Sequence, residues 1–100
     1  MFDLARITGF DWDAGNSAKS VDRHSVAQGE AEQVFADDLL LMADDVKHSH
    51  SEPRYHALGR TMEGRMLHVT FTLRDHDTRI RVISARDMNR RERGLYESQA

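Results

Sequence analysis

The chain has 100 residues, of which 39% are hydrophobic and 31% charged. This length and balance predict a single domain over residues 1–100 with one modest hydrophobic core. It contains no cysteine, which excludes a disulfide framework, a thiolate zinc site and a cysteine nucleophile. No apolar run has the length of a membrane span, and the first nine residues lack the features of a signal peptide. We therefore expect a cytoplasmic protein with no membrane partner.

The formal net charge of −3 is unevenly distributed along the chain. Residues 1–50 hold ten Asp and Glu against four Lys and Arg, whereas residues 51–100 hold seven against ten, and all ten are arginine. A basic half on a mildly acidic protein favours a localised site for an anionic ligand over a general nucleic-acid coat.

The first predicted elements are a short strand at residues 7–12 and a helix that Asp13 caps. The helix has a narrow apolar stripe of Ala14, Ala18 and Val21. We interpret Trp12 as a core anchor, with stacking on a nucleobase as the alternative.

Three basic side chains lie close to one face of this predicted helix: Lys19, Arg23 and His24. Because positions i, i+4 and i+5 are neighbours on a helix, these groups could meet a phosphate together. The alternative is an ordinary solvated helix face.

Residues 25–28 resemble a capping box that starts a second amphipathic helix. Residues 39–42 form a continuous apolar run that predicts a buried strand, and residues 44–53 predict a polar loop. The loop carries His48 and His50, with His56 nearby, but no third ligand has a recognisable spacing. We therefore predict neither a metal nor another cofactor.

The second half predicts a hairpin of strands at residues 54–61 and 65–73, a strand at 78–86 and a final helix capped by Asp87 or Asn89. The core face of the second hairpin strand consists of Leu67, Val69, Phe71 and Leu73. The complete pattern predicts an α+β fold, an antiparallel sheet with two N-terminal helices and a C-terminal helix on one face. The other face of the sheet is then free to bind a ligand.

Strand alternation places Arg79 and Arg81 on one face of the strand at 78–86, opposite the apolar Ile80 and Val82. Paired guanidiniums suit a phosphate because each presents a planar set of donors and stays charged. The alternative is a solvated edge strand whose arginines pair with cross-strand acids.

Several ordered motifs resemble the BrnT family of type II toxins: Phe10-Asp11-Trp12-Asp13, Arg23-His24, Glu30-Ala31 with Val34-Phe35-Ala36-Asp37, residues 54–61, Gly64-Arg65, residues 79–86, and residues 90–93 with Tyr96-Glu97. Together they span the chain from Phe10 to Glu97. The sequence departs from the family pattern at three positions in or beside the first predicted helix. Asn16 replaces a usual lysine, Ser20 a common asparagine and Ser25 a common glycine.

The resemblance implies a RelE-like fold, endoribonuclease activity that stops translation, and a BrnA-type antitoxin. This antitoxin would be a ribbon-helix-helix protein that alone contacts DNA, and we expect a complex of two toxins with two antitoxins. Leu95 and Tyr96 on the last helix are candidate anchors, although packing on the sheet is the likelier use of Leu95.

Metal-independent RNA cleavage requires removal of the 2′-hydroxyl proton, stabilisation of charge on the phosphorane and protonation of the leaving oxygen. Arginine suits the second task, and histidine suits the proton transfers. The predicted catalytic residues are His24, Arg60, Arg79, Arg81 and Arg86, and the predicted RNA contacts are Lys19, Arg23, Arg54 and His56.

Three alternatives accompany this prediction. Arg86 could instead bind the last helix, and His56 and His68 could be ordinary sheet-surface residues with water partners. The whole protein could be a non-enzymatic binding module that acts with a DNA-binding partner as a transcriptional regulator.

Overall fold

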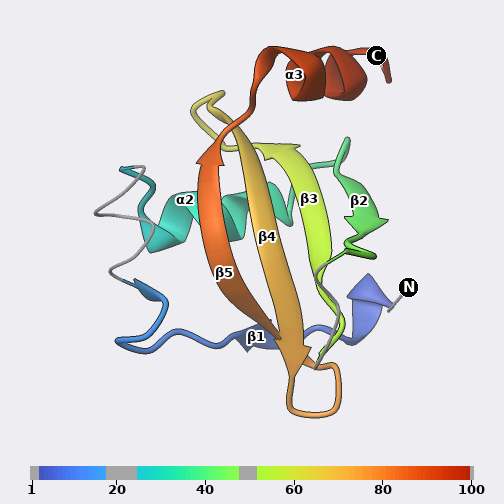
Figure 1. Ribbon diagram of the computed structural model, residues 1–100. Helices are drawn as coiled ribbons and strands as arrows, with labels where there is room; N and C mark the ends of the chain where they lie inside the picture. The colour runs from blue at the N-terminus through green and yellow to red at the C-terminus, as the bar shows by residue number, and fades with distance from the viewer. Residues whose placement is uncertain (1–2, 18–24, 48–51, 100) are drawn as a thin grey trace.

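The computed structural model describes residues 3–17, 25–47 and 52–99. Figure 1 shows the arrangement of its elements along the chain. They are η1 (Leu4–Arg6), β1 (Gly9–Phe10), α2 (Gln28–Val34), β2 (Leu41–Asp44), β3 (Tyr55–Arg60), β4 (Met66–Arg74), β5 (Arg79–Asp87) and α3 (Arg90–Glu97). Residues 14–16 form a turn, and the rest of the first predicted helix falls mainly on residues 18–24, outside the described residues.

The five strands form one sheet in the order β1-β5-β4-β3-β2. Strands β2 to β5 make the predicted antiparallel meander, but β1 runs parallel to β5, with Gly9 opposite Arg79 and Phe10 opposite Ile80. The sheet is therefore mixed, and the prediction of a purely antiparallel sheet is wrong. A strand of two residues has no alternation pattern from which its partner or direction could be inferred.

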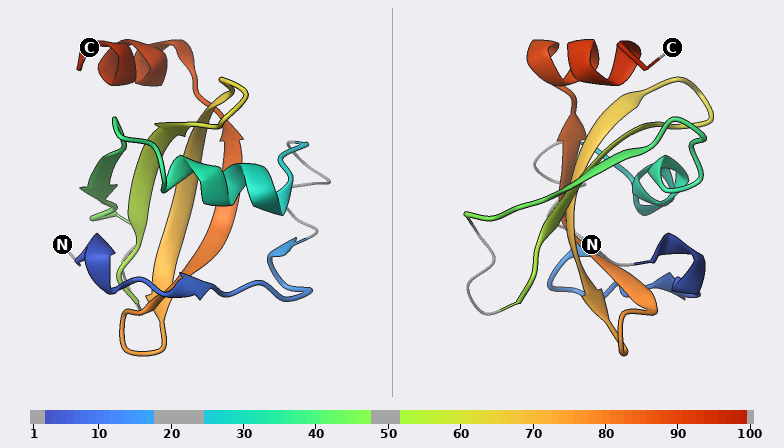
Figure 2. Two further views of the ribbon diagram at one scale, coloured as in Figure 1. Left: turned by 180° about the vertical axis from the view of Figure 1, so that it is seen from behind. Right: turned by 90° about the vertical axis from the view of Figure 1, so that its right-hand side faces the viewer.

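The core lies between α2 and the face of the sheet that α2 covers (Figure 2). Val34 of α2 is fully buried, as are Leu67, Val69 and Phe71 of the predicted face of β4 and Ile80 and Val82 of β5, whereas the predicted Leu73 is only half-buried. Phe71 packs edge-on against Phe35, with ring centroids 5.0 Å apart. An irregularity between Thr70 and Phe71 shifts the register of β5, which keeps Ala85 in the core after Val82.

Helix α2 begins at Gln28 with Ala27 as its N-cap, and the predicted N-cap Ser25 is not used. The Glu30 carboxylate accepts from the Ala27 N–H at 3.0 Å, which satisfies a backbone donor of the first turn. Ser25 cannot extend the helix because its φ is 55°, in the left-handed region that favours glycine.

Strand β2 begins two residues later than predicted and lies at the edge of the sheet. The side chain of Asp37 accepts from the Leu39 N–H, and its carbonyl accepts from the Leu40 N–H. This turn occupies the first half of the apolar run and leaves Leu39 41% exposed. The prediction of a buried strand at residues 39–42 is therefore wrong.

Helix α3 is capped by Asn89, one of the two predicted caps, and lies across the ends of the strands (Figure 2). Its Tyr96 packs with Met88 on Leu58, which faces away from α2. The sequence had predicted all the helices on one face of the sheet, and this prediction is wrong, because α2 and α3 contact residues of opposite faces. Tyr96 is 2% exposed and Leu95 is 52% exposed, the reverse of the predicted use of these two residues.

Gly59 allows α2 to approach the sheet closely. A Cβ at this position would lie 2.7 Å from Val34 Cγ1 and 2.9 Å from the Val34 carbonyl oxygen. We expect Gly59→Ala to reduce the free energy of unfolding by ~1–3 kcal/mol, measured by urea denaturation, because a packed helix must shift. Gly29→Ala is the matched control, since no atom lies within 4 Å of its Cβ, and equal stability of the two variants would contradict the expectation.

Candidate active site

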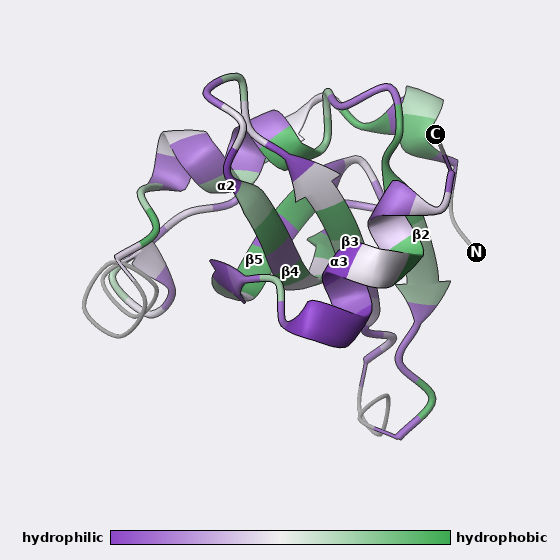
Figure 3. Ribbon diagram, turned by 90° about the horizontal axis from the view of Figure 1, so that it is seen from above, coloured by the Kyte–Doolittle hydropathy of each residue, from purple (hydrophilic) through white to green (hydrophobic). Residues whose placement is uncertain are grey.

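The face of the sheet opposite α2 carries a pocket of about 350 Å³. Its floor is formed by His56 and Leu58 of β3 and His68 of β4, and its walls come from β2 and α3. Figure 3 looks down on α3 and the sheet beneath it. The antiparallel register sets the floor, because Leu58 is opposite His68 and His56 is opposite Thr70.

The two histidine rings lie against each other, with centroids 4.8 Å apart and planes inclined by 32°. His56 Nε2 is 3.1 Å from a carboxylate oxygen of Asp45, and His56 Nδ1 is 3.1 Å from the Thr70 hydroxyl. Because an ionised carboxylate only accepts, the neutral His56 ring carries its proton on Nε2 and accepts from Thr70 at Nδ1. Asp45 therefore fixes the tautomer of His56 and leaves Nδ1, which accepts from Thr70, as the basic nitrogen of the ring.

His68 is the more buried of the two histidines. Burial, which penalises the charged ring, lowers the pKa of His68 to about 4, and the positive charge of Arg86 acts in the same direction. Glu92, with an oxygen 3.9 Å from His68 Nε2, opposes this shift only in part. His68 is therefore neutral at neutral pH.

Arg86 is held by Glu92 of α3 through two hydrogen bonds of 2.8 and 2.9 Å. Burial works against ionisation of Glu92, yet hydrogen bonds from Arg86 and from the Asn89 N–H lower the pKa of Glu92 to about 2. The predicted alternative, that Arg86 binds the last helix, is confirmed. The Arg86 side chain is 36% exposed beside the histidine pair and also donates to the Asp87 carbonyl, which leaves further guanidinium donors for a ligand.

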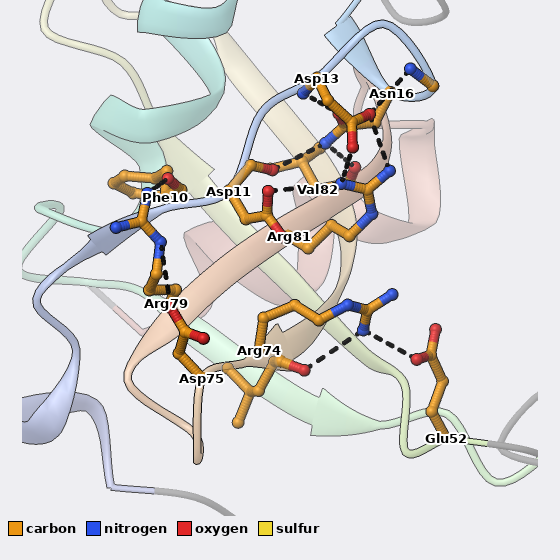
Figure 4. Close-up of polar contacts among 12 residues, drawn as sticks. Phe10, Asp11, Asp13, Asn16, Glu52, Arg74, Asp75, Arg79, Arg81 and Val82 are labelled. Carbon is orange, nitrogen blue, oxygen red and sulfur yellow. Dashed lines mark hydrogen bonds and ion pairs between the residues drawn. The ribbon is translucent and has the colours of Figure 1, made fainter.

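Arg81 lies at the other end of the sheet and makes a two-point ion pair with Asp13 (Figure 4). Both hydrogen bonds are 3.0 Å long, Asp11 lies 3.5 Å away, and the Arg81 side chain is 18% exposed. The hydrogen bonds from Arg81 lower the pKa of Asp13. Arg81 is thus paired with acids, as the alternative for this strand predicted. These acids come from the segment after β1 and not from a neighbouring strand.

The four predicted catalytic arginines do not converge on one point. Arg79 donates to the Phe10 carbonyl beside β1 (Figure 4), while the Arg60 guanidinium lies 5.7 Å from the Tyr96 ring at the α3 end. Arg81 and Arg86 are five residues apart on one strand, ~16 Å at the usual rise. Arg86 alone of the four makes the contacts described here with the Glu92–His68 pair.

Asn16, at the position of the family's usual lysine, is 4% exposed and has a structural set of contacts (Figure 4). Its amide nitrogen donates to the carbonyls of Asp11 and Val82 at 3.0 and 2.9 Å. Its side-chain oxygen accepts from the Asp13 N–H at 2.8 Å. A lysine could not make this set because it has no acceptor, so this departure ties the segment after β1 to β5.

Three predicted residues, Lys19, Arg23 and His24, lie outside the described residues, as do His48 and His50. Arg54 immediately precedes β3, and its carbonyl accepts from the Asp45 N–H. The predicted site included His56 but not its neighbours Asp45, Thr70, His68 and Glu92. The hairpin at residues 62–64 contained a signal for two of these, because it sets Thr70 and His68 beside β3.

Among the described residues, no group of three or more His, Cys, Asp or Glu side chains is arranged to hold a metal ion. None of the helices in this part of the chain is long and apolar enough to cross a membrane.

A mixed sheet with α2 on one face, and with the paired imidazoles and Arg86 on the other, defines a small α+β protein. The model of a family described as "Ribonuclease toxin, BrnT, of type II toxin-antitoxin system" matches residues 12–92, and the chain belongs to this family. The matched range includes His56, His68, Arg86 and Glu92.

One solved structure with a similar fold is the 1.1 Å crystal structure of the Brucella abortus ribonuclease toxin BrnT. The two chains are 17% identical, the TM-score is 0.61, and the alignment covers 82% of this chain and 97% of the Brucella chain. No curated protein sequence matches the chain.

Proposed function

We propose that this chain is a metal-independent, cytoplasmic endoribonuclease of RelE-like type that stops translation, with its catalytic centre at His56 and Arg86. The observation that carries the proposal is the pair of stacked histidines beside a partly exposed guanidinium. It offers a proton acceptor and a charge stabiliser on the uncovered face of the sheet.

In this proposal the 2′-hydroxyl of the RNA attacks the adjacent phosphorus. It takes the place of the Thr70 hydroxyl at His56 Nδ1, and Nδ1 receives its proton. The ionised Asp45 at Nε2 stabilises the imidazolium that forms. Arg86 donates to the non-bridging oxygens as their negative charge grows.

The leaving 5′-oxygen departs on the opposite side of the phosphorus and needs a proton from a second group. Neutral His68 is a poor donor at neutral pH because its pKa is lowered to about 4. The predicted catalytic residue His24 is our candidate for this role, with Lys19, Arg23 and Arg54 as contacts to the flanking phosphates.

The experiment is cleavage of a labelled RNA by the purified protein, with and without a chelator. Equal cleavage in both conditions is the expected result. Loss of cleavage with chelator would refute metal independence, and absence of cleavage in both would favour the binding module.

We further propose that the inhibitory partner is a BrnA-type ribbon-helix-helix antitoxin and that this partner alone contacts DNA. The exposed Leu39 and Leu95 are apolar residues available to anchor a partner, and the Gln99 side chain ties the two segments by donating to the Leu39 carbonyl. Arg90 and Arg91, both exposed on α3, provide charge for orienting an acidic partner.

We expect the co-expressed pair to form a two-plus-two assembly with at least ~1,600 Å² of buried interface. Light scattering of the purified complex measures its mass, and the RNA assay measures its inhibition. A one-to-one particle, or a complex that cleaves RNA at the full rate, would contradict this expectation.

A further inference from the structure

The pocket beside the histidine pair has a shape and lining that the proposed cleavage chemistry does not itself require. Its volume, about 350 Å³, is near the lower end of the ~300–1,000 Å³ typical of small-molecule pockets. Its walls are largely apolar, with Leu41 and Ala43 of β2 on one side and Leu95 of α3 on the other. A pocket of this kind suits a flat, partly apolar group.

The floor and rim of the pocket suit the two parts of a nucleotide. The His56 and His68 rings on the floor offer the aromatic surface on which unpaired bases stack. Arg91 lines the pocket and is exposed at its rim, where its charge complements a backbone phosphate. Asn89 also lines the pocket and brings an amide group whose nitrogen can donate to a base edge.

We infer that this pocket is a nucleobase subsite that takes one unpaired base next to the phosphate being cleaved. The inference rests on the proposed function, because His56 belongs both to the pocket and to the proposed catalytic centre. The bases of an A-form duplex are stacked and paired, and its deep major groove excludes side chains, so a base must leave the duplex to enter. The protein should therefore act on single-stranded RNA.

The test fills the pocket from its walls and leaves the proposed catalytic residues unsubstituted. Binding is measured separately from cleavage, because Ala43 lies opposite His56 in the sheet. Ala43 is an exposed residue of the edge strand β2, where a tryptophan is well tolerated, so Ala43→Trp blocks the pocket from its wall. Met62→Trp is the control, because Met62 is 87% exposed in the hairpin between β3 and β4 and does not line the pocket. Leu95→Trp fills the same pocket from α3 and serves if Ala43→Trp fails to fold.

Binding is measured with a single-stranded 2′-fluoro RNA, which lacks the nucleophilic hydroxyl, carrying 2-aminopurine at successive positions. We expect quenching of the fluorescence at one position by the wild type, and ~10–100-fold weaker binding by Ala43→Trp but not by Met62→Trp. Cleavage of the corresponding natural RNA should fall in parallel, and annealing it to a complementary strand should protect it.

Wild-type binding and cleavage by a folded Ala43→Trp variant, or equal cleavage of single-stranded and duplex RNA, would overturn the subsite. Pocket-dependent binding of the 2′-fluoro RNA without cleavage of natural RNA would support the subsite and refute the proposed activity. Cleavage of natural RNA that is unchanged when the pocket is filled would support the proposed activity and refute the subsite.

Discussion

Replacing Arg86 by alanine is expected to lower the rate constant of RNA cleavage by ~100–1,000-fold, the effect typical of removing one group that stabilises transition-state charge. The guanidinium is held in place by Glu92, and the Arg86 side chain is still 36% exposed beside the histidine pair. Single-turnover cleavage of a labelled RNA measures the effect, and urea denaturation reports the folded fraction.

Glu92→Ala is the matched control for this variant. It breaks the same ion pair but keeps the cation, so a loss of activity caused only by loosening of α3 would appear in both variants. We expect Glu92→Ala to retain much more activity than Arg86→Ala when both are folded.

Arg81→Ala distinguishes the two ends of the sheet. Arg81 joins β5 to the segment after β1 through its two hydrogen bonds with Asp13, so we expect its removal to reduce stability slightly and to lower cleavage less than Arg86→Ala does. A greater loss with folded Arg81→Ala than with Arg86→Ala would place the catalytic centre at the β1 end, as the sequence had predicted for Arg79 and Arg81.

Replacing His56 by glutamine is expected to lower cleavage by ~100–10,000-fold, because it removes the group that accepts the 2′-hydroxyl proton. His68→Gln is the control within the same pair. Its ring is neutral near pH 7 and has no proton-transfer role in the proposal, so its loss should be far smaller.

The pH dependence of the rate separates these roles. The pKa of His68 is lowered to about 4, so His68 stays neutral from pH 5 to 8 and cannot cause a change of rate in that range. A loss of activity as the pH falls below neutrality must therefore come from a group other than His68, and the pH profile of His56→Gln tests the proposed general base. His24→Gln should lose most activity, and with it the decline in rate on the alkaline side, where the wild-type general acid loses its proton.

An unchanged pH profile in both variants, together with reduced stability, would contradict proton transfer by these histidines. The profile is measured with saturating RNA at constant ionic strength, because phosphate binding by arginines depends on salt.

Much of the second half of the fold followed from local pattern. Alternating apolar residues in β4, flanked by two turns, predicted the hairpin and the core face with Phe71. The turn at residues 75–77 is real, and all three of its residues have positive φ. The first half was less predictable, because β1 has two residues and β2 lies at an edge where one side has no neighbouring strand.

The sequence by itself determined the α+β class, the meander of four strands and the family to which the chain belongs. Each of these depends on the spacing of residues along one chain. Only the tertiary structure decided which charges are available. Whether an arginine is paired depends on residues far away in the sequence, as with Asp13 and Arg81, 68 positions apart. The same holds for Asp45, whose place beside His56 follows from the pairing of β2 with β3. Strand alternation predicts the face on which a side chain lies, but only packing brings distant partners to that face.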